Sequence, residues 1–307
     1  MNEVFQGRSN VFLEQPVVSM IRSRFNLLLL IASFLSMAVP VVQAAPESEL
    51  WERWAVHDTA SEKVIDHSAW TQLLRRFVVP SNDGVNRFAY AKFRKPHRFQ
   101  LDEYIRRLSN IPISEYNREQ QRAYWINLYN ALTIAVIDRN FPVQSIRDIA
   151  SGFISRGPWD LELIEIEGEA LTLNDIEHRI LRPIWKDARI HYAVNCASIG
   201  CPNLQDQAFT ADNTESLLQQ AAIEFINHPR GAKVVDDELQ VSSIYIWFIE
   251  DFGGDDQSVI AHLKRYAKGD LLSALNQVDE IDNHRYDWSI NSVSKPEKRR
   301  SSRSRGS

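Results

Sequence analysis

The sequence lacks internal repeats and long low-complexity segments, and no Pro- or Gly-rich linker divides its central part. Nothing therefore marks a boundary between domains. The chain that remains after a short N-terminal segment is long enough to form one domain with a substantial core. We expect a single domain over residues 45–291.

Positive charge is outnumbered by negative charge in this central part. Of the net charge of −5, residues 1–44 carry +1 and residues 292–307 carry +5, which leaves −11 for residues 45–291. An acidic body is a poor match to nucleic acid or to an anionic membrane surface, so we expect no nucleic-acid partner. Residues 292–307 are rich in Ser and Arg, and we expect them to form a disordered basic tail.

Long hydrophobic runs are missing except near the N-terminus. Arg22 and Arg24 precede an interrupted apolar run over residues 25–42. Val42-Gln43-Ala44 then has small or modest residues at the positions that a signal peptidase recognises. These are the parts of a secretory signal peptide, and the run is short of the ~20 residues that span a bilayer. No cysteine near Ala44 could carry a lipid. We expect cleavage near Ala44, a periplasmic or secreted mature protein without a stable membrane span, and Met20 as an alternative start.

Helical and strand patterns alternate along the rest of the chain. Helical patterns cover residues 49–56, 68–79, 101–108, 114–139, 175–181 and 214–227, with short helices over 244–276. Strand patterns cover residues 85–93, 161–166, 189–195 and 284–290, with a hairpin formed by 234–235 and 239–241. Helices combined with several non-adjacent strands predict an α+β fold.

Residues 123–137 have a helical pattern that is apolar on nearly every side. This pattern predicts a buried central helix packed against a small mixed sheet. Asn127, Asn130 and Thr133 interrupt it at a spacing that gathers them into one sector. A buried amide left unpaired costs about 1–3 kcal/mol, so polar groups must face this stripe. The amides either secure the backbone of a neighbouring loop or line a site and position a catalytic group or a substrate carbonyl.

Four ordered segments resemble the domain of unknown function 547 family of bacteria and plants. They are Tyr124–Leu132, Asp175–Arg182, His191–Pro202 and Tyr286–Asn291. Together they span most of the mature chain, and the resemblance implies an exported bacterial member of that family. It implies no reaction and assigns no catalytic residue.

The chain's only two cysteines lie in the third of these segments, and several interpretations compete for them. A disulfide between Cys196 and Cys201 suits an oxidising compartment, and closing about six residues contributes roughly 2 kcal/mol. Zinc bound by His178, His191 and both cysteines is disfavoured by the wide spacing of the ligands. A redox role is weakened because the spacing is not Cys-x-x-Cys. We predict no metal site and no cofactor.

A cysteine nucleophile is the favoured catalytic interpretation. Cys196 follows the strand predicted over residues 189–195 and enters a loop of small residues that leaves its sulfur accessible. A nearby base would activate its thiol, and His191 or His178, the latter beside Glu177, are the candidates. Asn127 or Asn130 would supply a positioning amide.

The sequence thus favours a cysteine-dependent hydrolase or acyltransferase that acts on an envelope peptide or amide. The alternative is a non-catalytic envelope protein that binds a small ligand and uses the Cys196–Cys201 disulfide only to hold a loop. The state of the two thiols in native protein distinguishes these functions.

Overall fold

The computed structural model describes residues 46–149 and 157–293. The predicted signal peptide, Ala45 and the basic tail from residue 294 onward lie outside these residues. Within them, helices and small sheets combine in an α+β fold, as predicted. None of the helices in the described ranges is long and apolar enough to cross a membrane.

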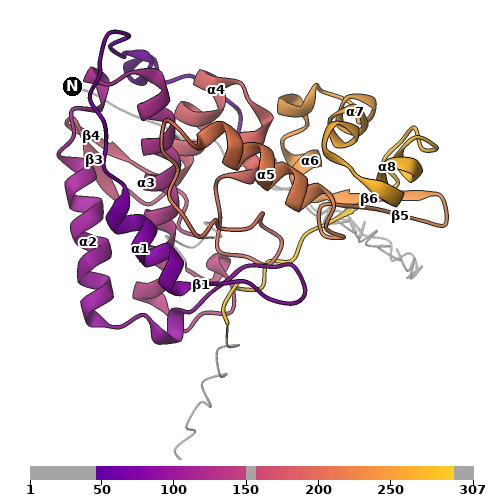
Figure 1. Cartoon of the computed structure of the whole chain (residues 1–307), viewed down its shortest axis with the longest axis horizontal. Coiled ribbons are helices and arrows are strands. Elements are labelled where there is room, and N and C mark those ends of the chain that lie inside the picture. Colours follow the sequence, from indigo (N-terminus) through magenta and orange to yellow (C-terminus); the bar gives the residue numbers. More distant parts are fainter. Residues whose placement is uncertain (1–45, 150–156, 294–307) are drawn as a thin grey trace, which may run out of the picture. The chain divides into compact units, whose positions relative to one another are not determined.

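The longer helices form the framework of the domain (Figure 1). They are α1 (Ser68–Phe77), α2 (Lys95–Ser109), α3 (Arg118–Asn140), α5 (Thr214–Ile226) and α7 (Asp256–Tyr266). Short helices connect them: α4 (Arg182–Trp185), α6 (Ser243–Trp247), α8 (Gly269–Leu275), the π-helix η5 (Asp175–Leu181), and the 3₁₀ helices η1 (Glu52–Ala55), η2 (Tyr90–Lys92), η3 (Ile113–Glu115), η4 (Ile146–Asp148), η6 (Ala188–Tyr192) and η7 (Ile249–Phe252).

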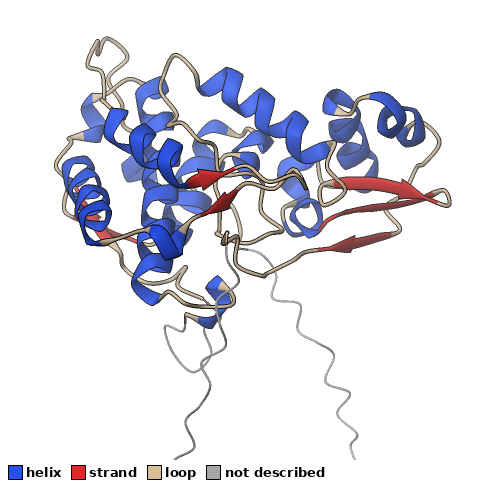
Figure 2. Cartoon of the chain, turned by 60° about the horizontal axis from the view of Figure 1, so that its bottom comes forward, coloured by secondary structure: helices blue, strands red, loops and turns tan. Residues whose placement is uncertain are grey.

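The strands form three small, separate sheets (Figure 2). β1 (Val78–Val79) pairs antiparallel with β2 (Arg87–Phe88), and β3 (Ile164–Ile166) pairs antiparallel with β4 (Glu169–Leu171). The third sheet is mixed: β6 (Glu238–Ser242) lies antiparallel to β5 (Ala232–Val235) and parallel to β7 (Asn283–Arg285). Asp236 and Asp237 have positive φ at the β5–β6 turn, the backbone that a two-residue hairpin requires.

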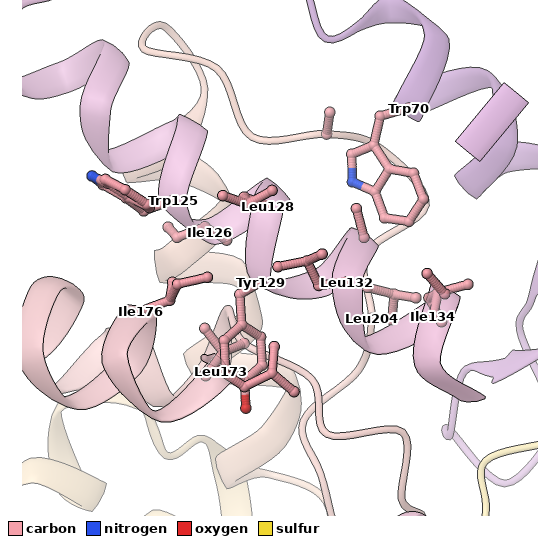
Figure 3. Packing of buried hydrophobic residues seen from close by; sticks show 14 of the residues in the cluster. Trp70, Trp125, Ile126, Leu128, Tyr129, Leu132, Ile134, Leu173, Ile176 and Leu204 are labelled. Carbon is pink, nitrogen blue, oxygen red and sulfur yellow. The ribbon is translucent and has the colours of Figure 1, made fainter. Parts of the chain in front are cut away.

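Helix α3 lies at the centre of the larger hydrophobic cluster, buried from Ala123 to Asp138. The helix begins later than the pattern over 114–139 predicts, because Asn117 and not Ser114 caps it: the Asn117 side chain accepts a hydrogen bond from the backbone N–H of Gln120 at 3.0 Å. Figure 3 shows Trp70 on one side of α3 and Leu173 and Ile176 on another. The helix is therefore enclosed all round, as its composition predicts.

The surroundings of α3 differ from the expectation that it packs on a sheet. Its main partners are α2 and η5, whereas β5 and β6 belong to a second hydrophobic cluster with α7. This second cluster lies at the far end of the domain from α2 (Figure 1). An apolar helix surface can be buried by helices as well as by a sheet, and its sequence does not distinguish the two.

The prediction of a strand over residues 189–195 is wrong. Residues 188–192 form the 3₁₀ helix η6, which begins where the Asp187 side chain accepts a hydrogen bond from the backbone N–H of Arg189 at 2.9 Å. A short apolar run is compatible with either structure, and here the cap at its start decides for a helical turn. The strand predicted over residues 85–93 likewise shrinks to Arg87–Phe88, followed by η2.

Candidate functional site

The polar stripe of α3 holds two loops by their backbones. The Asn130 amide donates to the carbonyl of Ala193 at 2.9 Å, and its oxygen accepts from the N–H of Asn195 at 2.8 Å. One turn earlier, Asn127 bonds both the carbonyl and the N–H of Phe209, at 2.7 and 3.0 Å. Both amides therefore secure neighbouring loops, which is one of the two roles that their sequence spacing predicts.

The loop from Asn195 to Asn203 has further anchors that do not involve sulfur. The Asn195 side chain donates to the carbonyl of Pro202 at 2.7 Å and accepts from the N–H of Ala197 at 2.9 Å. The backbone N–H groups of Ile199 and Gly200 donate to carbonyls of the segment 287–289, each at 2.8 Å. These bonds hold Ala197 at φ 59°, a left-handed conformation that is costly for a residue with a side chain. The backbone of this loop is thus fixed from several directions.

A disulfide joins Cys196 to Cys201 within this loop. Cys201 is buried, with 4% of its surface exposed, whereas Cys196 is half-buried. The backbone N–H of Cys196 donates to Cys201 Sγ at 3.0 Å. Of the two sulfur atoms, that of Cys196 belongs to the more accessible residue.

Two hydroxyl groups surround the sulfur atoms. Tyr286 Oη lies 3.0 Å from Cys196 Sγ and 3.1 Å from Cys201 Sγ, and Ser198 Oγ lies 3.2 Å from Cys196 Sγ. The same two hydroxyls are 2.8 Å apart and bond to one another. Burial raises the pKa of Tyr286, so its hydroxyl stays protonated and can donate to sulfur. Sequence reasoning missed Tyr286 as a site residue, although it stands in the last of the four segments that resemble the family.

Aromatic rings adjoin Tyr286. The Trp247 ring lies 4.9 Å and the Trp288 ring 4.6 Å from that of Tyr286, centroid to centroid. Trp159 makes an edge contact with Trp288 at 5.8 Å. All three tryptophans are only partly buried, so a partly exposed aromatic group adjoins the disulfide.

His191 lies in a different cluster, between two carboxylates. Its Nε2 is 2.7 Å from Asp251 Oδ2 and its Nδ1 is 3.7 Å from Glu177 Oε1, and its ring stacks on Phe248 at 4.3 Å. Burial alone would lower the pKa of His191, but the two carboxylates outweigh it and raise the pKa. Both ring nitrogens of His191 are thus directed at carboxylates rather than at a thiol.

His178 and Glu177 lie in the same cluster as His191. His178 Nδ1 is 3.0 Å from a guanidinium nitrogen of Arg182, and Arg182 Nε donates to Asp251 at 2.5 Å. Burial lowers the pKa of His178 to about 4, so it is neutral at pH 7. Burial opposes ionisation of Glu177, yet its neighbours, the two histidines and Tyr129, lower its pKa to about 2.

A cavity of about 480 Å³ adjoins this second cluster. Arg182 and Asp251 line it together with other polar residues and the N-terminal segment of the described chain. The carbonyl of Pro46 accepts a hydrogen bond from Arg182 at 2.8 Å, and the N–H of Glu49 donates to the carbonyl of His178 at 3.1 Å. The beginning of the described chain therefore lies directly against the His178–Arg182 segment.

The predicted site residues thus fall into two groups. Glu177, His178 and His191 lie in one cluster with Arg182 and Asp251, and sequence reasoning did not identify Asp251. Cys196 pairs with Cys201 in the loop that Asn130 anchors, and Asn127 holds a different loop. Within the described ranges, neither His191 nor His178 makes a hydrogen bond to Cys196. Nor do the described residues include a group of three or more His, Cys, Asp or Glu side chains that could hold a metal ion.

Residues 113–226 match the model of a family described as protein of unknown function, DUF547. The match begins just before α3, contains η5, η6 and the disulfide loop, and ends with α5. Asp251 and Tyr286 lie beyond it. No curated protein and no solved structure matches the chain.

Proposed function

We propose that this protein carries out thiol–disulfide exchange in the cell envelope, with Cys196 as the sulfur that partners attack. The observation that carries the proposal is the independence of the loop from its disulfide. The hydrogen bonds that Asn130, Asn195 and the segment 287–289 make with the loop do not involve sulfur, so we expect them to hold it in both redox states. The two sulfurs then remain neighbours in both redox states, as a reversible centre requires.

A purely structural role accounts less well for this disulfide. The stabilisation by a disulfide grows with the length of the loop that it closes, and the sequence separation here is 5. It therefore closes one of the shortest loops and contributes roughly 2 kcal/mol at most. The strained φ of Ala197 is also typical of functional sites rather than of simple connections.

The exchange proceeds in two steps. A thiolate of a dithiol substrate attacks Cys196 Sγ, forms a mixed disulfide and releases Cys201 as thiolate. The N–H of Cys196 and the hydroxyl of Tyr286, both within 3.1 Å of Cys201 Sγ, stabilise this leaving group.

The second thiolate of the substrate then attacks the substrate sulfur of the mixed disulfide and releases Cys196. Ser198 and Tyr286 donate to the departing sulfur. The substrate dithiol is oxidised to a disulfide, and the Cys196–Cys201 disulfide is reduced. The two protons that the substrate thiols lose pass to the two cysteine thiolates or to solvent. The partly exposed rings of Trp247 and Trp288 give the substrate an apolar surface beside Tyr286, whose hydroxyl contacts the reacting sulfur.

Hydrolysis or acyl transfer by Cys196 has less support, because both histidines are engaged with other groups. The test is an equilibrium of native protein with reduced and oxidised glutathione, followed by alkylation and mass spectrometry. We expect reversible opening of the disulfide in folded protein. Cys201→Ser should leave a reactive Cys196 that forms mixed disulfides, whereas Cys196→Ser should leave an unreactive Cys201 because that residue is buried.

A disulfide that opens only on unfolding would contradict this function and leave the non-catalytic ligand-binding protein as the better account. Equal reactivity of the two single variants would contradict the assignment of Cys196 as the attacked sulfur.

A further inference from the structure

We infer that Arg230 is a positioning residue that stabilises the reduced, thiolate form of the centre and so makes the Cys196–Cys201 disulfide an oxidant. The inference rests on the proposed thiol–disulfide exchange. Arg230 lies beyond the segment that matches the family and in the loop between α5 and β5.

The side chain of Arg230 lies directly against the disulfide loop. One guanidinium nitrogen donates to the carbonyl of Ile199, inside the loop, at 2.9 Å, and the other donates to Asn203 Oδ1 at 2.6 Å. The guanidinium also lies over the ring of Phe225, 5.5 Å from its centroid. Its Nε is buried and has no hydrogen-bond partner among the described residues.

The charge of Arg230 is not balanced in the disulfide form. Within the described ranges, no carboxylate oxygen lies within 4.0 Å of its guanidinium, whereas Arg182 and Arg122 are each paired, with Asp251 and Asp187. The more distant ionisable groups around Arg230 include Asp83, Arg87, Glu224 and Tyr286, and the Asp83 carboxylate is already paired with Arg87 at 2.6 Å. The His228 ring also adjoins Arg230, whose backbone N–H donates to His228 Nδ1 at 3.1 Å. Burial of this uncompensated cation lowers the pKa of Arg230 to about 10.

Reduction supplies the missing negative charge. When the disulfide opens, a thiolate forms in the loop that Arg230 contacts, close to the hydroxyl of Tyr286 that bonds both sulfurs. A cation beside a cysteine lowers the pKa of its thiol, and stabilising the reduced form makes a disulfide more oxidising. Arg230 thereby favours the direction of exchange in which the substrate dithiol is oxidised.

The test compares Arg230→Gln, which removes the charge and keeps hydrogen-bond donors, with Arg230→Lys, which keeps the charge. Arg285→Gln is the control. Arg285 is exposed, and it donates to the carbonyl of Pro229, the residue before Arg230. Each protein is equilibrated with glutathione, and the rate of alkylation of the reduced protein is followed against pH.

We expect Arg230→Gln to shift the equilibrium toward the disulfide about tenfold, which is about 30 mV for this two-electron couple. The midpoint pH of alkylation should rise by about one unit. Arg230→Lys and Arg285→Gln should stay close to the parent protein. If Arg230→Gln keeps the parent's equilibrium, or Lys shifts it as far as Gln does, the inference is wrong.

Three further outcomes complete the test. If Arg230→Gln does not fold, the reduced parent protein is sufficient: an alkylation midpoint at or above the ordinary value of ~8.5 overturns the role of Arg230. A parent disulfide that does not equilibrate with glutathione overturns the exchange function and this inference with it. If the parent disulfide equilibrates with glutathione and Arg230→Gln has the same equilibrium, the inference about Arg230 is wrong but the exchange function stands.

Discussion

Substitutions of Asn127 and Asn130 can be compared to distinguish an effect on stability from an effect on the chemistry of the cysteines. They lie one turn apart on α3 and are 1% and 3% exposed. Each makes two hydrogen bonds to the backbone of a loop, Asn127 to Phe209 and Asn130 to Ala193 and Asn195. Only the loop held by Asn130 carries the disulfide.

Replacing either residue by Leu keeps a similar volume and fits the apolar helix. It leaves one buried N–H and one buried carbonyl without a partner, at about 1–3 kcal/mol each. We expect Asn127→Leu and Asn130→Leu each to lower the free energy of unfolding by about 3 kcal/mol, after the gain from a more apolar side chain is subtracted. In a domain of this size, the melting temperature should fall by roughly 6–12 °C.

Only Asn130→Leu should also change the chemistry of the cysteines. Freeing the backbone on both sides of the Ala193–Asn195 segment lets Cys196 move away from Cys201, which lowers the effective concentration of one thiol at the other. Its disulfide should therefore be reduced at a lower concentration of glutathione than that of Asn127→Leu. Urea unfolding and a glutathione titration check both effects. Equal shifts of the redox equilibrium in the two variants would refute the idea that Asn130 positions the disulfide loop. An unchanged free energy of unfolding in both variants would refute the expected loss of about 3 kcal/mol.

Three other outcomes are expected. Replacing both Cys196 and Cys201 by Ser should cost no more stability than either single change, about 2 kcal/mol by urea unfolding, because each change breaks the same bond. Tyr286→Phe should raise the midpoint pH of Cys196 alkylation, since a donor to the thiolate is lost; an unchanged midpoint would count against that hydrogen bond. Because burial lowers the pKa of His178 to about 4, its contribution to stability is present above pH ~6.5 and is lost as the pH falls toward 4. His178→Gln should accordingly reduce the difference in unfolding free energy between pH 7.5 and pH 4.5 by about 2 kcal/mol. An unchanged difference would show that folding does not lower the pKa of His178.

Several features of this protein follow from local sequence alone. The all-round apolar pattern of residues 123–137 requires a buried helix, and the three polar residues on it require partners, whatever surrounds them. The β5–β6 hairpin and α5 are equally local, because turn residues and helical periodicity lie within a few positions of one another. The proximity of Cys196 and Cys201 along the chain makes a disulfide one natural outcome.

Which distant side chains contact His191 and Cys196 depends on tertiary structure. His191 meets Asp251, which is 60 residues away, and Cys196 meets Tyr286, which is 90 residues away. Sequence periodicity records which face of an element is buried but carries no information about which distant side chain will lie opposite. The sequence therefore offers both histidines as partners of Cys196, whereas two carboxylates and Arg182 engage them in the folded chain. Only the folded chain places the hydroxyls of Ser198 and Tyr286, rather than an imidazole, beside the sulfurs, and the guanidinium of Arg230 against the carbonyl of Ile199 in the same loop.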